Sequence, residues 1–284
     1  IRDDLVTGVQ TCALPISHLR VIPVNNRGEI ELKKLQELLN PKVKLVAVAH
    51  IANATGVMHE VKKIIEMAHA SGAKVLLDAA QSVPHIAFSV QELDVDFLVF
   101  SGHKIYGPTG VGVLYAKKAL LESMVPYQAG GDMVDKVSFS GTTYQKAPLK
   151  FEAGTPNIVG VIGLGAALDF VKKVGRDKIA TVEKELMNHA INRLQGVTGL
   201  KFLTESKEMT SLISFTCEGC HPLDIGSLLD ARGICVRTGH LCAQPTLERF
   251  GVTSVVRVSF GIYNTVEEID VLADTLEDIL KVLR

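Results

Sequence analysis

The chain has 284 residues and an almost balanced charge, with 30 Lys and Arg residues against 31 Asp and Glu residues. Hydrophobic residues make up 47% and charged residues 21% of it, which is typical of a globular protein and excludes a disordered one. The net charge of −1 argues against a nucleic-acid-binding protein, which normally carries a basic excess. No apolar run approaches the ~18 residues of a membrane span, and the first residues do not resemble a secretory signal peptide. We therefore expect neither a nucleic acid nor a membrane as a partner.

The first 17 residues differ from the rest of the chain, because they show no sustained period of 2 or 3.6 residues. This segment resembles a translated sequencing adapter joined to a reading frame, so we exclude residues 1–17, with Cys12, from the fold prediction. The remaining cysteines are Cys217, Cys220, Cys235 and Cys242. An odd, unevenly placed set of five is not a disulfide framework, and we expect a reducing, cytoplasmic setting.

From residue 19 onward, short apolar runs alternate with helical patterns. The patterns predict strands at 19–24, 45–49, 74–77, 97–100 and 111–115, and helices at 31–39 and 61–69. Strands that are apolar on both faces and alternate with helices are typical of a mostly parallel, helix-covered sheet. The fold class is therefore α/β, and we assign residues 18–165 to the remainder of a large domain.

The pattern changes after about residue 155. It predicts helices at 159–174, 178–194, 223–231 and 266–283, and strands at 212–216, 234–236 and 255–259. The length of the chain also favours about two domains. We therefore expect a smaller C-terminal α+β domain over residues 166–284.

Polar residues follow three of the predicted strands of the large domain. Asp78 ends one strand, Ser101 begins a polar segment that contains Lys104, and Asn53 lies just beyond a third strand. Ligands of open α/β sheets bind at the carboxyl ends of the strands, so these groups should converge. A partly desolvated lysine is suited to Schiff-base chemistry, and an aspartate is the partner of a pyridinium nitrogen. Together they suggest pyridoxal 5′-phosphate (PLP); the alternative is that Asp78 caps a helix and Lys104 is a solvated turn residue.

The Cys217-Glu218-Gly219-Cys220-His221 segment matches the pattern that attaches c-type haem. We reject that interpretation because haem attachment requires export, and we reject zinc because a second ligand pair is missing. We predict instead that Cys217 ends a strand and that Cys220 and His221 form a turn, and we expect no metal site.

Four motifs occur in a fixed order along the chain. They are Asp-Ala-Ala-Gln at 78–81, Ser-Gly-His-Lys-Ile-Tyr-Gly-Pro-Thr-Gly at 101–110, Phe-Glu-Ala-Gly-Thr-Pro-Asn at 151–157 and Arg-Thr-Gly-His-Leu-Cys-Ala-Gln-Pro at 237–245. With these motifs the chain resembles the cysteine desulfurase/selenocysteine lyase family, most of all its Suf-type branch, within the class V aminotransferase-like PLP enzymes of fold type I. The resemblance extends from about residue 19 to residue 283.

The resemblance implies a role for each matching residue. Lys104 would attach PLP covalently, and Cys242 would receive sulfur from the substrate. The other implied cofactor ligands are Asp78 at the pyridine nitrogen, Gln81 at the ring hydroxyl, Ser101 and His103 at the phosphate, and Thr155 at the phosphate of the other subunit's site. The implied ligands of the substrate carboxylate are Asn53, Arg237 and Arg257, with Arg257 as the principal one, because a guanidinium grips a carboxylate with two hydrogen bonds. Arg237 and His240 lie close to Cys242 in sequence, and either could favour its thiolate.

The function that the resemblance implies is conversion of L-cysteine to L-alanine and an enzyme persulfide, which a sulfur-acceptor protein collects for iron–sulfur cluster assembly. It also implies a homodimer. A selenocysteine lyase or a transaminase on the same scaffold is the enzymatic alternative. Family members carry a further segment before residue 19, with a helix N-terminus that binds the phosphate and a ring-stacking histidine, so we expect an N-terminally truncated chain. An inactive truncated fragment is therefore the non-enzymatic alternative.

Overall fold

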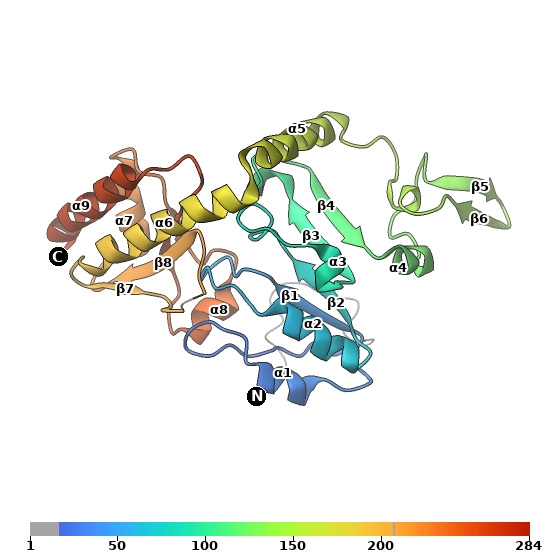
Figure 1. Cartoon of the computed structure of the whole chain (residues 1–284), viewed down its shortest axis with the longest axis horizontal. Coiled ribbons are helices and arrows are strands. Elements are labelled where there is room, and N and C mark those ends of the chain that lie inside the picture. The colour runs from blue at the N-terminus through green and yellow to red at the C-terminus, as the bar shows by residue number, and fades with distance from the viewer. Residues whose placement is uncertain (1–16, 207) are drawn as a thin grey trace.

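A computed structural model describes residues 17–206 and 208–284 of the chain (Figure 1). The elements follow one another as α1 (Leu32–Leu38), β1 (Leu45–Ala49), α2 (Val61–Ala70), β2 (Lys74–Asp78), α3 (Val90–Leu93), β3 (Phe97–Ser101), the 3-10 helix η1 (Gly102–Lys104), β4 (Gly112–Ala116), α4 (Lys118–Ser123), β5 (Val134–Ser138), β6 (Gly141–Tyr144), η2 (Leu149–Phe151), α5 (Ile158–Val174), α6 (Arg176–Gln195), β7 (Leu200–Phe202), β8 (Leu212–Cys217), α7 (Pro222–Asp230), β9 (Arg237–Gly239), α8 (Gln244–Arg249), β10 (Val255–Ser259) and α9 (Val266–Leu283).

The first sheet has the strand order β1-β2-β3-β4. Strands β1, β2 and β3 are parallel, and β4 runs antiparallel to β3. In the register of the sheet Asp78 is the Cα partner of Ala49 on one side and of Val99 on the other. The carboxyl ends of the three parallel strands therefore lie at one edge, which is where the polar residues of the sequence motifs were expected.

An apolar core packs against this first sheet. Its α2 residues Val61, Ile64, Ile65 and Ala68 recur at the helical spacing that places them on one face, and α2 packs against β2. Helices α5 and α6 contribute Leu164, Val171 and Ile179 to the same core. The predicted helix-covered α/β sheet is confirmed.

A second sheet, with the strand order β7-β8-β10-β9, is entirely antiparallel. A second apolar core forms between this sheet and helices α6, α7 and α9, with Phe215 of β8 and Leu276 of α9 fully buried in it. Helix α6 belongs to both cores, because Ile179 near its start packs in the first and Leu186 and Leu194 pack in the second. Figure 1 shows this long helix running from the first sheet to the second. The boundary at 165/166 between two domains stays a prediction.

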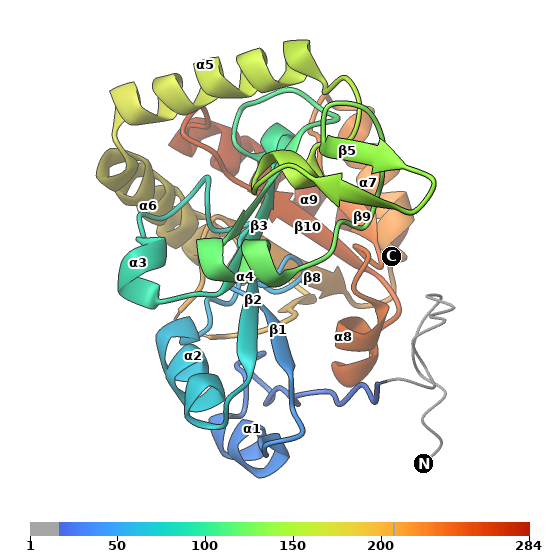
Figure 2. The ribbon, with the colours of Figure 1, turned by 90° about the vertical axis from the view of Figure 1, so that its right-hand side faces the viewer.

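The β5–β6 hairpin projects away from both sheets in Figure 1, and in Figure 2, viewed from that side, it lies in front of them. Its side chains are exposed, including Val137 and Phe139. Helix α5 also keeps an apolar outer face, on which Val159 and Ile162 are 82% and 69% exposed. Neighbouring exposed apolar residues of this kind are a common feature of protein interfaces.

Two predicted strands are wrong. Residues 19–24 form no strand: only Val24 makes an isolated bridge, to Ile30, and Leu19 and Val21 are exposed without a sheet neighbour. Residues 234–236 are irregular, and the strand starts later as β9, because the pairing of Gly239 with Val255 places that segment beside β10.

Residues 1–16 of the excluded segment, with Cys12, lie outside the described residues. Across the described residues, no helix is both long and apolar enough to cross a membrane.

Candidate active site

Asp78 and Ser101 occupy the last positions of two adjacent parallel strands, β2 and β3. The Asp78 carboxylate accepts a hydrogen bond from the backbone N–H of Ala80 (Oδ1–N 2.9 Å), which orients it at the start of the following turn. Gln81 lies half-buried in that turn. The two motif segments at 78–81 and 101–104 therefore meet at one sheet edge, as the sequence predicted.

Lys104 ends the 3-10 helix that follows β3, and its side chain is exposed, like that of His103. Two glycines make the surrounding backbone compact. The Gly107 N–H donates to the Gly102 carbonyl (3.0 Å), and a Cβ at Gly102 would lie 2.8 Å from Val111 Cγ1. Only glycine permits so close an approach, and the result is a fixed backbone position for Lys104 beside Asp78's strand.

Two arginines face each other across neighbouring strands of the second sheet. Arg257 on β10 is the Cα partner of Arg237 on β9. Arg257 Nη1 donates to the Asn53 carbonyl (3.0 Å), while its Nε is buried and has no hydrogen-bond partner among the described residues. Burial lowers the pKa of Arg257, and the charge of Arg237 lowers it further. The two positive charges and the unpaired Nε–H of Arg257 are suited to binding an anion. A carboxylate fits best, because its two oxygens can accept two parallel hydrogen bonds from one guanidinium.

Cys242 lies in the short connection between β9 and α8. Leu241 and Cys242 both have a φ of 56°, in the left-handed region that non-glycine residues rarely occupy. Two contacts hold this backbone: Asn53 Nδ2 donates to the Leu241 carbonyl (2.7 Å), and the Cys242 N–H donates to His240 Nδ1 (3.2 Å). The Cys242 side chain is exposed. Strain of this kind often marks a functional loop whose position the surrounding structure fixes.

Asn53 connects the arginine pair to the segment that carries Cys242. Its carbonyl accepts from Arg257 and its side chain donates to Leu241. Three residues earlier, the His50 N–H donates to the Asp78 carbonyl (2.9 Å). The segment after β1 therefore contacts the edge of the first sheet at Asp78 and, through Asn53, both Arg257 and Leu241. The structure therefore brings Asn53, Arg257 and the Cys242 loop into contact.

Thr155 is placed differently from the other predicted site residues. It is exposed in the segment between η2 and α5. Within the described part of the chain, no hydrogen bond joins Thr155 to Asp78, Ser101 or Lys104. Its role at a neighbouring subunit's site stays a prediction.

Two histidines beside this edge were not singled out by the sequence motifs. His50 is 6% exposed, its ring packs edge-on against Phe88 (centroids 5.1 Å apart), and the His59 N–H donates to its carbonyl (2.9 Å). Burial lowers the pKa of each to about 4, and for His50 the nearby His59 adds to the effect. The Nδ1 atoms of both have no partner among the described residues. The sequence feature that could have identified His50 is its position directly after strand β1, since the polar segment that begins at Ser101, the last residue of β3, is placed in a similar way.

The donor set at the sheet edge fits PLP. A carboxylate for a pyridinium nitrogen, an amide for a ring hydroxyl, a hydroxyl and an imidazole for a phosphate, and an amine for an aldehyde are contributed by Asp78, Gln81, Ser101, His103 and Lys104. The strand register and the glycine-supported turn at 102–107 bring these groups to the same edge.

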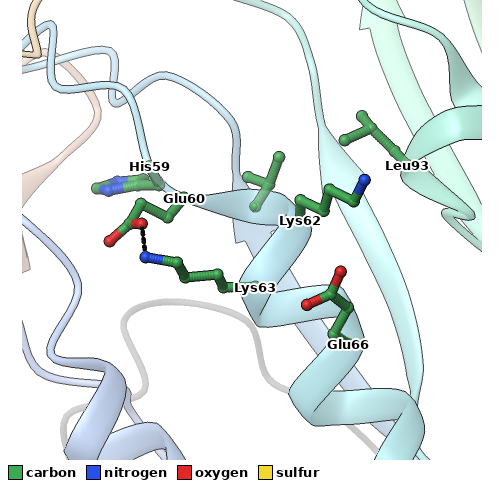
Figure 3. A pocket seen from close by; sticks show the side chains of 7 residues that line it. His59, Glu60, Lys62, Lys63, Glu66 and Leu93 are labelled. Carbon is green, nitrogen blue, oxygen red and sulfur yellow. Dashed lines mark hydrogen bonds and ion pairs between the residues drawn. The ribbon is translucent and has the colours of Figure 1, made fainter.

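A separate hollow lies at the start of α2 (Figure 3). Its lining residues are His59, Glu60, Val61, Lys62, Lys63, Glu66 and Leu93. Glu60 and Lys63 form an ion pair there, and none of the predicted site residues lines it. We therefore locate the candidate active site by its chemistry, at the sheet edge.

The chain is similar to known proteins over most of its length. The family model for aminotransferase class V matches residues 7–272. A cysteine desulfurase of Synechococcus elongatus is 47% identical over 276 residues, which cover 97% of this chain and 44% of that protein. One of Shigella sonnei is 46% identical over 281 residues, which cover 99% of this chain and 69% of that protein. The crystal structure of the Escherichia coli cysteine desulfurase CsdA superposes with a TM-score of 0.89 at 40% identity, and the match covers 93% of this chain and 65% of CsdA.

The matched relatives are longer than this chain. The chain spans less than half of the Synechococcus elongatus protein and of a probable cysteine desulfurase of Mycobacterium leprae, at 44% and 43% of their lengths. The similarity therefore covers only part of each of these two proteins.

Proposed function

Because this chain belongs to the class V aminotransferase family, among the cysteine desulfurases, we propose that the whole protein converts L-cysteine to L-alanine and an enzyme persulfide with PLP as cofactor. The observation that carries the proposal is the position of Asn53. This one residue contacts both Arg257, which is suited to a carboxylate, and the residue before Cys242. A carboxylate-binding group and a nucleophilic thiol are thereby held at a defined separation, as a reaction on an amino acid's side chain requires.

Five residues would hold the cofactor. Asp78 would bind the ring nitrogen, Gln81 the ring hydroxyl, and Ser101 and His103 the phosphate, while Lys104 would attach the cofactor covalently. When bound, PLP acts as an electron sink that stabilises negative charge at the substrate Cα. The Asp78 carboxylate would favour a protonated ring nitrogen, the form in which the ring accepts electrons most readily.

The chain's own residues orient the substrate and move its protons. The guanidinium of Arg257 binds the carboxylate of cysteine through Nε and the rest of its fork, and Arg237 adds a second positive charge. Lys104 Nζ then removes the Cα proton and later returns a proton to the carbon skeleton. These steps depend on an amine at the end of η1, directly after the end of β3.

Cys242 carries out the sulfur transfer. Its thiolate attacks the substrate Sγ, a new S–S bond forms, and the bond between substrate Cβ and Sγ breaks with its electron pair remaining on the carbon side. Protonation of that carbon gives alanine, so one cysteine and one Cys242 thiol yield one alanine and one persulfide. Thiol exchange with an acceptor protein of iron–sulfur cluster assembly then removes the outer sulfur.

The proposal includes a two-fold homodimer. Exposed apolar residues on α5 and on the β5–β6 hairpin support it, because such surfaces mark protein interfaces. Thr155, which precedes α5, would then serve the partner's phosphate site. The cytoplasm is the proposed compartment, because persulfide chemistry at Cys242 requires a thiol that the surroundings keep reduced.

The test separates cofactor attachment from sulfur transfer. In the whole protein, PLP fixed by borohydride is mapped by mass spectrometry, and cysteine-dependent alanine and persulfide are measured. Lys104→Ala should lose the fixed adduct, while Cys242→Ala should keep it and lose the persulfide. Lys33→Ala and Cys235→Ala, at exposed positions outside the site, are the matched controls. An adduct on another lysine, or wild-type desulfuration by Cys242→Ala, would refute the proposal.

A further inference from the structure

A pair of cysteines lies outside the candidate active site, at the end of β8. Cys217 is the last residue of that strand, where it pairs with Leu200 of β7, and Cys220 follows after a two-residue turn. Both are free thiols. The proposed desulfurase chemistry uses neither of them, since it needs only Cys242.

The turn brings the two residues directly opposite each other. The Cys220 N–H donates to the Cys217 carbonyl (3.2 Å), and the two residues form an antiparallel bridge. Gly219 between them has a φ of 75°, the left-handed conformation that the third position of such a turn requires. Bridged antiparallel residues have Cα atoms about 4.5–5.5 Å apart and side chains on the same face of the ribbon. A disulfide needs Cα atoms about 4.4–6.8 Å apart, so the backbone is already in the required range.

Both side chains point to the same apolar core. Cys217 is 4% exposed and is part of the core of the second sheet, and the half-buried Cys220 packs against that same core. Burial raises the pKa of the Cys217 thiol to about 11, and the neighbouring Cys220 adds to the rise. The two sulfur atoms are therefore neighbours in one environment, with one of them accessible to solvent.

Metal binding does not account for the pair. No cluster of three or more His, Cys, Asp and Glu side chains occurs in the described part of the chain. His221, the next residue, uses Nδ1 to accept a hydrogen bond from the Leu223 N–H at the start of α7 (3.2 Å). Two adjacent thiols without a third ligand are suited to oxidation.

We propose that Cys217 and Cys220 form a second reactive site, a dithiol that low-molecular-weight disulfides such as glutathione disulfide convert reversibly into an intramolecular disulfide. Cys220, the accessible thiol, attacks first. Its sulfur forms a bond to one glutathione sulfur, the S–S bond of glutathione disulfide breaks, and one glutathione leaves with the proton. Cys217 then loses its proton, attacks Cys220 Sγ and expels the second glutathione. Two protein thiols are oxidised, and one glutathione disulfide is reduced to two glutathiones.

Trypsin isolates this pair from the other cysteines. Residues 208–232 contain no internal Lys or Arg, so cleavage after Lys207 and Arg232 releases one peptide that carries only Cys217 and Cys220. The reduced chain is incubated at a series of glutathione disulfide to glutathione ratios, alkylated, digested and analysed by mass spectrometry. At oxidising ratios we expect this peptide to carry no alkyl group and to weigh two hydrogen atoms less than the reduced, unalkylated peptide. Treatment with dithiothreitol before alkylation should restore the form with two alkyl groups. Two alkyl groups at every ratio would overturn the proposal.

Variants test the order of the two steps. Cys217→Ala should accumulate glutathione on Cys220, because the resolving thiol is gone, whereas Cys220→Ala should leave Cys217 unmodified in the folded chain. Circular dichroism confirms that each variant folds. Cys235→Ala, which removes an exposed unpaired thiol, should form the disulfide like the unchanged chain. A glutathione adduct that persists on Cys220 while Cys217 is intact would also overturn the proposal, since it would mean that the two sulfurs cannot join.

Discussion

Asn53 Nδ2 donates a hydrogen bond of 2.7 Å to the carbonyl of Leu241, a residue 188 positions further along the chain. The acceptor precedes Cys242 in a stretch where two consecutive non-glycine residues have positive φ. The strained backbone that presents the thiol is therefore held by a residue of the first sheet's edge. The second contact of Asn53, from Arg257 to its carbonyl, links the same point to the arginine pair.

Loss of the Asn53 side chain should impair sulfur transfer more than cofactor attachment. Asn53→Ala removes one hydrogen bond, so the free energy of unfolding should fall by about 1 kcal/mol. Misplacement of the Cys242 loop should lower persulfide formation in the whole protein by about 10- to 100-fold. PLP fixed on Lys104 should be unchanged. Asn188→Ala, at an exposed position of α6, is the control, and equal persulfide rates in both variants would contradict the prediction.

Arg257→Lys should weaken the binding of substrate. Lysine keeps the positive charge but has no Nε donor and no planar fork, so one charged hydrogen bond to the substrate carboxylate is lost. Such a bond is worth about 1.5–3 kcal/mol, which corresponds to a rise in the KM for cysteine of about 10- to 100-fold. Steady-state kinetics of the whole protein measure it, with Arg232→Lys, at an exposed position, as the control. A KM within twofold of the unchanged enzyme would argue against a carboxylate at Arg257.

Two histidines with lowered pKa values, His50 and His59, should make the chain sensitive to acid. The pKa of His50 and of His59 falls from 6.5 to about 4 on folding, chiefly through burial. Both stay neutral in the folded chain while the unfolded chain takes up protons, so stability is complete above pH 6.5 and is lost as the pH falls from 6.5 toward 4. Between these two pH values, each histidine should lower the free energy of unfolding by about 1.4 kcal/mol for each pH unit of acidification. Denaturant unfolding of the chain from pH 4.5 to 7.5 measures it.

A variant identifies the groups responsible for that slope. His59→Asn should reduce it by about 1.4 kcal/mol per pH unit, while His18→Asn, at an exposed position, should leave it unchanged. An unaltered slope in His59→Asn would mean that another group controls the acid sensitivity.

Glu183 should have the opposite dependence on pH. This α6 residue is 1% exposed, its Oε2 lies 2.8 Å from His85 Nδ1, and its Oε1 is buried without a partner among the described residues. Burial raises the pKa of Glu183. The folded chain thus favours the protonated carboxyl group of Glu183. The contribution of Glu183 to the free energy of unfolding is therefore fully present below pH 4.5, and it is lost as the pH rises through the pKa of the folded chain.

Glu183→Gln removes that ionisation and keeps a group that can bond to His85. The difference in unfolding free energy between the variant and the unchanged chain should grow in favour of the variant as the pH rises from 4.5 to 7. Glu185→Gln, an exposed neighbour on the same helix, should show no such trend. Parallel stability curves for Glu183→Gln and the unchanged chain would exclude the effect.

The sequence predicted the elements whose apolar residues are buried. Strands β1 and β10 begin and end where their apolar runs do, and β2 and β3 extend one residue further. The β5–β6 hairpin was not predicted, because its residues are exposed and carry no pattern of burial. Strand β9 was displaced in the prediction, since its place is decided by pairing with β10 rather than by hydrophobicity.

In the candidate site, too, local features were predictable from the sequence and long-range contacts were not. The positions of Asp78 and Ser101 at strand ends, and of Lys104 shortly after one, follow from local sequence, and the structure has them there. The contact of Asn53 with Leu241 joins segments far apart in the chain, and such a contact depends on the packing of two sheets. The edge-on contact of His50 with Phe88 is of the same kind, which is why neither interaction is visible in a motif.

Helix α6 has a consequence for how the chain melts. Its first turns pack in one core through Ile179 and its last turns pack in the other through Leu194. A helix of 20 residues is stabilised mainly by the surfaces it packs against, so the loss of either core exposes half of its apolar face and weakens its hold on the other. The two sheets are thereby coupled into a single cooperative transition, in which calorimetric and van't Hoff enthalpies should agree.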